Sequence, residues 1–340
     1  MKVSIITTIY KAEKDLPRLL DSMMAQKSQE LEFFLIDNGS PDKCGDICRE
    51  YAKKDSRFTV YTIKDNVGYI RARNIGMKEC SGDYIGFCDS DDYLEVGGYD
   101  RAIEKIKEYD CDLYITAYRT VSENSQVVNH IPYETGVYEG SRIQACILPQ
   151  AFGDINGKSA LHGFAWKQII RRSVILENDL TFLPELQPYE DQIFNIDVIK
   201  GCNRVCIDDN IIYNYVVNVQ SITAKLNLNF NAKAEWNRIK LFWNEKKSRA
   251  TEQQHIEAYN NQALKFIYCM ILNMAKTNEK SVKELTVQLD DIIDENIVRE
   301  ILGNSSKNNG RQIDFVKSCL FGKKYRRLFL VMRIALKTRQ

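Results

Sequence analysis

The first 120 residues alternate short apolar runs with amphipathic stretches. The apolar runs predict buried strands at 3–10, 31–37, 58–63, 83–89 and 111–120. The stretches between them have helical periodicity and predict helices at 15–26, 43–55, 68–79 and 97–109. Strands that alternate with helices in this way are typical of βα units. The pattern therefore predicts an α/β fold, with a mainly parallel sheet flanked by helices.

The pattern changes along the rest of the chain. Residues 121–160 are irregular, with a hairpin or sheet extension within 127–140. The next elements that we expect are a strand, turn and helix at 166–180, a helix at 187–201 and strands at 203–217. Long amphipathic patterns then predict helices at about 229–247, 251–276 and 281–302. After the Gly/Asn/Ser-rich break at 303–310, the expected division is a domain at 1–225, a helical extension at 226–305 and a tail at 306–340.

Charge and cysteine content exclude some classes of function. The 47 basic and 46 acidic residues leave a formal charge of +1, so bulk electrostatics give no reason to expect a nucleic-acid partner. Ten cysteines are scattered along the chain. The pairs Cys44/Cys48 and Cys202/Cys206 lack a nearby histidine or second pair, so we interpret them as buried thiols rather than zinc ligands.

The N-terminal apolar run predicts a cytoplasmic location. It spans only about eight residues before Lys11, Glu13 and Lys14, which is too short for a signal peptide. No other stretch approaches the length of a membrane span.

The last 25 residues, 316–340, have the pattern of a basic amphipathic helix. Eight basic residues and no acidic residue follow Asp314. They are interleaved with the apolar residues Leu320, Phe321, Leu328, Phe329, Val331, Met332, Ile334 and Leu336. Such a helix either lies on an anionic membrane surface or packs on the protein with a solvated basic face, and the pattern favours neither.

An acidic run follows the strand predicted at 83–89. Asp89, Asp91 and Asp92 fall within four residues without an adjacent basic residue, so their carboxylates would repel one another. A divalent cation would relieve that repulsion, and hard oxygen ligands suit Mg²⁺ or Mn²⁺ bound to a diphosphate. The alternative is a polar turn in which an aspartate caps the next helix. The run alone supports both interpretations.

Polar residues also follow the first two predicted strands. Thr8 and Tyr10 end the first strand, and Asp37 and Asn38 end the second. The carboxyl ends of parallel strands meet at one sheet edge, where open α/β sheets bind ligands. We therefore expect these residues and the acidic run at the same edge.

Three segments in order and register resemble one known family. They are TIYKAEKDLPRLLDSM, LEFFLIDNGSPD and DNVGYIRARNIGMKECSGDYIGFCDSDD. They resemble the family 2 glycosyltransferases, whose GT-A fold has a Rossmann-like sheet. The resemblance is dense over residues 1 to about 120 and weaker to about 225, through HGFAWKQIIRRSVI, PYEDQIFNIDV and QSIT, and it does not reach the helical extension.

The resemblance implies a nucleotide-binding role for several residues. Thr8 and Tyr10 would line the base pocket, and Asp37 or Asn38 would hydrogen-bond the base. Family members often carry two acids at the latter positions, so Asn38 leaves the identity of the base open. Arg71 and Arg73 fall where a basic residue contacts the diphosphate, although either is equally a helix-face arginine. Asn74 and Gly76 are expected to let this helix approach the sheet closely.

The resemblance also implies how the acids divide their work. Asp91 would be a metal ligand, Asp89 a ribose or metal contact, and Asp92 a support. Asp191 would be the catalytic base, with Glu190 orienting it or contacting the acceptor. The alternative for this pair is a charged first turn of a helix. His162 and Trp166 would border the acceptor or sugar pocket, although Trp166 fits a packed core equally well.

The implied reaction is an inverting transfer that depends on Mn²⁺ or Mg²⁺. A hexose or N-acetylhexosamine would move from a UDP-sugar to a glycan, and a lipid-linked acceptor at the inner membrane face would suit both the family and the basic tail. Capsular, exopolysaccharide or O-antigen assembly would be the pathway in a bacterium.

Three alternatives stay open at this point. An aspartate-dependent phosphotransferase usually carries its motif on the first strand, which here ends in TTIY. A nucleotidyltransferase would need a Gly-rich phosphate loop after that strand, and the loop is missing. The third alternative is an inactive carbohydrate-binding relative.

Overall fold

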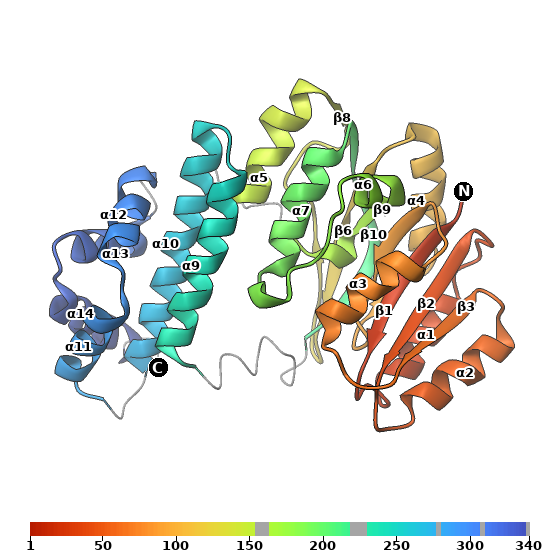
Figure 1. Cartoon of the computed structure of the whole chain (residues 1–340), viewed down its shortest axis with the longest axis horizontal. Coiled ribbons are helices and arrows are strands. Elements are labelled where there is room, and N and C mark those ends of the chain that lie inside the picture. Colours follow the sequence, from red (N-terminus) through yellow and green to blue (C-terminus); the bar gives the residue numbers. More distant parts are fainter. Residues whose placement is uncertain (154–162, 218–229, 277–279, 307–309, 338–340) are drawn as a thin grey trace. The chain divides into compact units, whose positions relative to one another are not determined.

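The structure is a computed structural model, and it describes residues 1–153, 163–217, 230–276, 280–306 and 310–337 (Figure 1). The chain forms two compact units. The first unit comprises Met1–Leu148 and Leu161–Val219, and the second comprises Pro149–Ala160 and Gln220–Gln340. The sequence pattern predicted a helical C-terminal region, but it did not predict that residues near 150 belong to it.

One sheet organises the first unit. Its strands are β1 (Val3–Ile9), β2 (Leu31–Asn38), β3 (Phe58–Ile63), β4 (Tyr84–Phe87), β5 (Tyr93–Leu94), β6 (Leu113–Val121), β7 (Gln126–Asn129), β8 (Gly136–Glu139), β9 (Gln168–Arg171) and β10 (Arg204–Val216). The strand order is β3-β2-β1-β4-β9-β6-β10-β5, with β7 beside β6 and β8 beside β10. The α/β fold predicted from the sequence is confirmed.

The sheet is mixed rather than uniformly parallel. Strands β3, β2, β1 and β4 are parallel neighbours, as predicted, and β6 and β10 are also parallel to each other. Strand β9 lies antiparallel between β4 and β6. The segment predicted at 127–140 proves to be a sheet extension, because β7 pairs with β6 and β8 with β10 rather than with each other.

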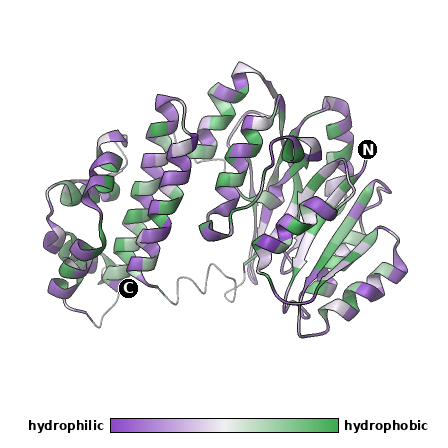
Figure 2. Cartoon of the chain, viewed as in Figure 1, coloured by the Kyte–Doolittle hydropathy of each residue, from purple (hydrophilic) through white to green (hydrophobic). Residues whose placement is uncertain are grey.

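Helices cover both faces of this sheet. They are α1 (Leu16–Met24), α2 (Cys44–Lys54), α3 (Tyr69–Glu79), α4 (Gly98–Tyr109), α6 (Arg172–Glu177) and α7 (Glu190–Gly201). Short helical turns lie at η1 (Ile143–Ile147), η2 (Ala165–Lys167) and η3 (Pro184–Leu186). Apolar residues run along β1 and β2 (Figure 2), and one buried cluster joins these strands to α1 and α4.

Helix α3 approaches β1 and β2 closely at Gly76. A Cβ added at Gly76 would come within 2.6 Å of Ile6 and 2.7 Å of Ile36, which is closer than side chains tolerate. The close approach predicted for Gly76 is therefore confirmed. Asn74 holds a neighbouring segment instead, since its side chain donates to the Phe182 carbonyl at 2.8 Å and accepts from the Phe182 amide at 2.9 Å.

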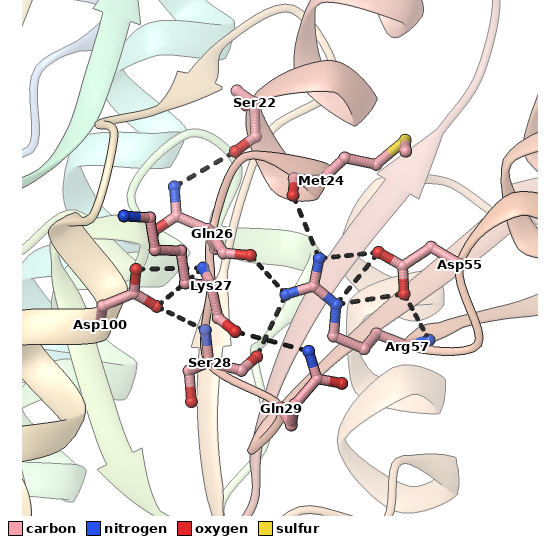
Figure 3. A network of polar contacts seen from close by, with 9 residues as sticks. All are labelled: Ser22, Met24, Gln26, Lys27, Ser28, Gln29, Asp55, Arg57 and Asp100. Carbon is pink, nitrogen blue, oxygen red and sulfur yellow. Dashed lines mark hydrogen bonds and ion pairs between the residues drawn. The ribbon is translucent and has the colours of Figure 1, made fainter.

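A polar network fixes the turn between α1 and β2 (Figure 3). Arg57 lies at its centre, paired with Asp55 at 2.7 Å. The same guanidinium donates to the carbonyls of Met24, Gln26 and Ser28. The carboxylate of Asp100 on α4 accepts from the amides of Lys27 and Ser28. These contacts join α1, β3 and α4 at the end of the sheet where β2 begins.

The second unit is helical in its described parts. It contains most of α5 (Leu148–Phe152), then α9 (Ala232–Arg249), α10 (Gln253–Lys276), α11 (Val282–Ile292), α12 (Glu295–Asn304), α13 (Arg311–Phe321) and α14 (Tyr325–Lys337). The helix predicted at 281–302 is two helices, because Asp294 caps α12 by accepting from the amides of Asn296 and Ile297. The tail is likewise divided, with a turn at Gly322–Lys324 between α13 and α14.

Residues 149–153 are built into this helical unit. The Nζ of the buried Lys246 on α9 donates to the carbonyl of Phe152 at 2.7 Å and to that of Ala151 at 3.3 Å. The Phe152 ring stacks on His255 of α10 with a 4.5 Å centroid separation. A Cβ at Gly153 would lie 2.3 Å from the Ala258 carbonyl oxygen, so this segment is in close contact with α10.

Among the residues that the structure describes, no helix is both long enough and apolar enough to cross a bilayer.

Candidate active site

The predicted site residues gather where β1, β2 and β4 end. Ile9 is opposite Asp37 in the sheet register, and the Cys88 amide donates to the Ile6 carbonyl at 3.0 Å. Asp89 therefore follows β4 close to the end of β1. The ends of β1, β2 and β4, after which these residues follow, belong to one sheet of the first unit (Figure 1).

The residues expected at the base pocket differ in their exposure and in their hydrogen bonds. Tyr10 is 41% exposed, so its ring is available for stacking, and Thr8 is partly exposed. Asp37 is buried and accepts from the Ser40 amide at 3.0 Å. Asn38 is also buried; its carbonyl accepts from the Val67 amide at 3.1 Å and its amide donates to Asn66 at 3.3 Å. Asn38 thus holds the loop before α3.

Asp92 is a buried support for the acidic run. One carboxylate oxygen accepts from the Tyr213 hydroxyl at 2.6 Å and the other from the Val216 amide at 2.7 Å. Burial, together with the charges of Asp89 and Asp91, raises the pKa of Asp92 well above its ordinary value. Since both oxygens face β10, we interpret Asp92 as a link between the acidic run and that strand rather than as a direct substrate contact.

Asp89 and Asp91 face a different environment. Asp89 accepts from an Arg73 nitrogen at 3.0 Å, and its side chain is 37% exposed. Arg18 donates to the main-chain carbonyl of Asp91 at 2.6 Å. No other residue that the structure describes donates a hydrogen bond to the Asp91 carboxylate. Burial and the charge of Asp89 raise the pKa of Asp91.

These two carboxylates fit part of a metal site. Within the described ranges, no group of three or more His, Cys, Asp or Glu side chains is arranged to hold a metal ion. Mg²⁺ and Mn²⁺ accept hard oxygen ligands, and Mg²⁺ is often held by one or two carboxylates together with substrate phosphates. Asp91 with Asp89 matches that pattern, in which phosphate oxygens would complete the coordination.

Arg73 on α3 links the acidic run to α7. Its guanidinium is buried and pairs with Asp191 at 2.8 Å as well as with Asp89. The rings of Phe182, Tyr69 and Phe87 surround it, with centroids 5.0 to 5.5 Å from the guanidinium carbon. Burial would lower the pKa of Arg73, but the charges of Asp191 and Asp89 raise it above its ordinary value.

Arg71 is placed differently from Arg73. It is exposed and donates to the Val67 carbonyl at 3.5 Å, beside the loop that Asn38 holds. Of the two arginines, Arg73 is thus the one that contacts the acids of the site.

Glu190 and Asp191 lie in the first turn of α7, as the sequence predicted. Asp191 accepts from Arg73 with one oxygen and from the Ala165 amide with the other, at 3.0 Å. Burial raises the pKa of Asp191, although Arg73 opposes the shift. Glu190 accepts from the Tyr69 hydroxyl at 2.5 Å, and its second oxygen has no partner among the described residues. Burial and the charge of Asp191 raise the pKa of Glu190.

An aromatic stack lies next to Asp191. Trp166 stacks on Tyr213 at 4.4 Å and on Phe164 at 4.9 Å. Trp166 is buried at 4% exposure, whereas Phe164 is 38% exposed. The packed-core alternative for Trp166 therefore fits the structure, and the ring at the surface belongs to Phe164. His162 lies outside the described residues.

Sequence reasoning missed three residues of this site. Tyr69 is one helical turn before Arg73, so their i, i+4 spacing is a signal that places both on one face of α3. Phe164 belongs to the segment HGFAWKQIIRRSVI, which resembles the family, but its exposure could not be judged from the sequence. Tyr213 had no signal, because its contact with Asp92 depends on how β10 pairs with β5.

Comparison with known proteins places the chain in a family. Residues 4–166 match the model for glycosyl transferase family 2. An uncharacterised glycosyltransferase of Haemophilus influenzae is 30% identical over 201 residues, which cover 58% of this chain and 72% of that protein. The chain belongs to glycosyl transferase family 2. The family 2 match includes the acidic run but ends before Glu190 and Asp191.

Two further comparisons describe the family 2 chain. The uncharacterised glycosyltransferase EpsJ of Bacillus subtilis is 28% identical over 223 residues, covering 65% of this chain and 62% of EpsJ, so the chain spans less than two thirds of that relative. The structure of S. aureus TarS 1–349 in complex with UDP-GlcNAc is similar with a TM-score of 0.70 and 19% identity, covering all of this chain and 93% of the other. This similarity confirms the expected GT-A fold.

Proposed function

We propose that this family 2 chain is an inverting glycosyltransferase of polysaccharide assembly. It moves a hexose or N-acetylhexosamine from a UDP-sugar to a hydroxyl of a glycan acceptor. Asp89 and Asp91 serve the donor diphosphate with Mn²⁺ or Mg²⁺, and Asp191 serves the acceptor.

The contact of Arg73 with both Asp89 and Asp191 carries this proposal. It joins a carboxylate after β4 to one in the first turn of α7 through a single guanidinium, at 3.0 and 2.8 Å. The two acids are far apart in sequence, and their common contact with Arg73 supports a single site in which Asp89 serves the donor and Asp191 the acceptor.

On the donor side, Tyr10 stacks on the base and Asp37 hydrogen-bonds it. A UDP donor is supported by the structural similarity to TarS, which was solved with UDP-GlcNAc. Asp91 and Asp89 are the residues that would hold the divalent cation, which supplies positive charge to the departing diphosphate. Asp92, held by Tyr213 and Val216, keeps the run in place.

On the acceptor side, Asp191 accepts the proton of the attacking hydroxyl. The Ala165 amide and Arg73 fix its orientation. A base with a raised pKa is better matched to neutral pH than an ordinary aspartate is. Direct attack on the anomeric carbon inverts its configuration, so an α-linked donor sugar gives a β-linked product.

Phe164 offers the acceptor a flat apolar surface beside the base. Its ring is 38% exposed and rests on the buried Trp166, so it is held in one orientation. A sugar ring of the acceptor glycan packs on this surface. A lipid-linked glycan is the acceptor that we propose, in capsular, exopolysaccharide or O-antigen assembly.

A donor screen tests this function. Thermal unfolding of the chain is followed with UDP, GDP or CDP, and with the corresponding sugar nucleotides, in Mn²⁺ or in a chelator. We expect UDP and a UDP-sugar to raise the Tm only when Mn²⁺ is present. Asp91→Asn should lose the Mn²⁺-dependent part, whereas the exposed Asp179→Asn should keep it.

Two outcomes would overturn the proposal in different ways. If no nucleoside diphosphate protected the chain in Mn²⁺ or Mg²⁺, the donor site would be wrong. If UDP-sugars protected the chain but none was hydrolysed or transferred to any glycan, the inactive carbohydrate-binding relative would be the better description.

A further inference from the structure

Helix α14 is apolar on two faces rather than one. Its inward face is formed by Tyr325, Leu328, Phe329 and Met332, which are all buried within the helical unit. Helices α11, α10 and α13 pack against α14. The packed alternative for the basic tail is thus correct for this face, and it leaves the outward face to be explained.

The outward face carries a second apolar stripe. Leu330, Val331 and Ile334 are 46%, 39% and 63% exposed. Leu330 follows Arg326 by four residues, Val331 follows Arg327 by four, and Ile334 follows Arg326 by eight. These spacings place all five residues on one side of the helix. An isolated exposed leucine needs no explanation, but three exposed branched residues on one helical face are a stripe.

Unpaired positive charge borders this stripe. Lys324, Arg326 and Arg327 are exposed and form no ion pair with any residue that the structure describes. Lys323 differs, because it pairs with Glu295 on α12. No acidic residue follows Asp314 in the sequence, so α14 itself supplies no carboxylate to these cations.

The exposed apolar stripe and the positive charge beside it together favour one kind of partner. A second copy that packed its α14 parallel to this one across a two-fold axis would bring Arg326 and Arg327 against the same arginines, and like charges would oppose that contact. An anionic bilayer complements both features: its headgroups attract the cations, and the acyl boundary accepts the apolar side chains.

We propose that α14 docks the chain on an anionic membrane surface. The helix lies in the plane of the interface with Leu330, Val331 and Ile334 inserted. Lys324, Arg326 and Arg327 contact lipid phosphates. Phe321, which is 71% exposed at the end of α13, adds an aromatic ring close by in the sequence. This attachment is independent of the transfer reaction and does not rest on it.

Vesicle binding of the full chain tests this proposal. The chain is sedimented with vesicles that contain phosphatidylglycerol and with vesicles of phosphatidylcholine alone, at low and high salt. We expect binding to the anionic vesicles only, and weaker binding at high salt. Leu330→Glu with Ile334→Glu should abolish binding, and Arg326→Gln with Arg327→Gln should weaken it by at least about tenfold.

Matched controls separate this face from general effects of charge. Val96→Glu with Leu176→Glu changes two exposed apolar residues of the first unit and should bind like the wild type. Lys53→Gln with Lys54→Gln removes two exposed charges from α2 and should bind nearly as well. Circular dichroism and thermal unfolding verify that each variant is folded.

Three results would overturn the proposal. The first is a wild-type chain that does not bind phosphatidylglycerol vesicles. The second is an α14 variant that is folded and binds as the wild type does. The third is a wild-type dimer in analytical ultracentrifugation that Leu330→Glu with Ile334→Glu dissociates, because this face would then bind a second copy.

Discussion

The side chains of Arg57 and Arg73 are only 8% and 5% exposed and both pair with carboxylates, yet they lie in different kinds of surroundings. Arg57 pairs with Asp55, a neighbour in sequence, and gives its remaining hydrogen bonds to main-chain carbonyls. Arg73 pairs with Asp89 and Asp191, which come from distant elements. One arginine completes a turn, and the other connects two functional segments.

The charge balance around the two arginines differs as well. Arg57 and Asp55 neutralise each other, and this interaction lowers the pKa of Asp55. Around Arg73, the acids outnumber the cation, and the pKa values of Glu190, Asp191, Asp91 and Asp92 are all raised. A side chain such as that of Arg57, whose charge and hydrogen bonds are fully matched, therefore has a structural role. An arginine surrounded by more acids than it can neutralise marks a candidate functional site, where a bound cation would offset the excess negative charge.

The largest expected effect concerns the base. Asp191→Asn should lower kcat on the order of 10³-fold, because removing a general base costs about 10²- to 10⁴-fold. Binding of UDP, followed by thermal unfolding, should persist. Full transfer activity in this variant would show that Asp191 is not the base. Asp179→Asn, on an exposed turn, is the control and should leave kcat unchanged.

The two arginines can be compared directly by replacing each with glutamine. Arg57→Gln should lower the free energy of unfolding by about 3 kcal/mol, since it leaves Asp55 and three carbonyls without their donor. Its kcat per folded molecule should not change. Arg73→Gln should lower kcat about 10²-fold, because Asp89 and Asp191 lose their common partner. Urea unfolding and initial rates measure both quantities.

That comparison fails if the effects are exchanged. An Arg57→Gln variant that is folded but inactive would mean that the turn between α1 and β2 acts on the reaction. An Arg73→Gln variant with normal kcat would remove Arg73 from the site.

The pH dependence of stability should also differ between the two regions. Folded Glu190 holds its proton more tightly than the unfolded chain does, with a pKa raised from 4.5 to about 7. Its contribution to the free energy of unfolding should therefore fall as pH rises from about 4.5 to about 7. Asp55 acts in the opposite direction, because its lowered pKa stabilises the fold above 3.8 and this gain is lost as pH falls.

Urea unfolding in a chelator, at several pH values between those limits, measures this slope. Glu190→Gln should make the slope shallower, and the exposed Glu185→Gln should leave it unchanged. An unaltered slope in Glu190→Gln would show that its burial does not disturb its titration.

The smallest effect is expected at the acceptor surface. Phe164→Ala should raise the KM for the acceptor about fivefold, because an aromatic contact contributes on the order of 1 kcal/mol. The KM for the donor should not change, which distinguishes this role from a general loss of structure. Leu176→Ala, on an exposed part of α6, is the control. A rise in donor KM alone would move Phe164 to the other substrate.

Much of the sheet and of its ligand edge followed from the sequence. The spacing of apolar residues and the length of each apolar segment predicted β1 to β4 and α1 to α4, because each of these elements buries a face that its own residues form. The acidic run and the acids of α7 were also predicted, because charged residues at strand ends and helix starts stand out. The antiparallel placement of β9 was not, because it depends on its pairing with β4 and β6, which are distant in sequence.

Contacts between distant elements explain the rest of the differences. Nothing in the local pattern around Arg73 shows that its partners are Asp89 and Asp191 rather than solvent. Phe164 and Trp166 are both aromatic residues, and the sequence does not show that the ring of Phe164 is exposed and that of Trp166 is buried. The apolar residues of α14 were visible in the sequence as part of a basic amphipathic pattern, but only the packing shows that they form two faces, one of them buried.

The short segment 149–153 has a consequence for how the chain is divided by proteases or by synthesis. This segment belongs to the helical core, but it is synthesised before most of that core, because Ala151 precedes its partner Lys246 by 95 residues. A chain cut after Val219 would keep Phe152 but lose the helices that bury it. The helical unit, released alone, would have a vacancy where this ring belongs. The two units are therefore interleaved along the chain, and neither corresponds to one uninterrupted stretch of sequence.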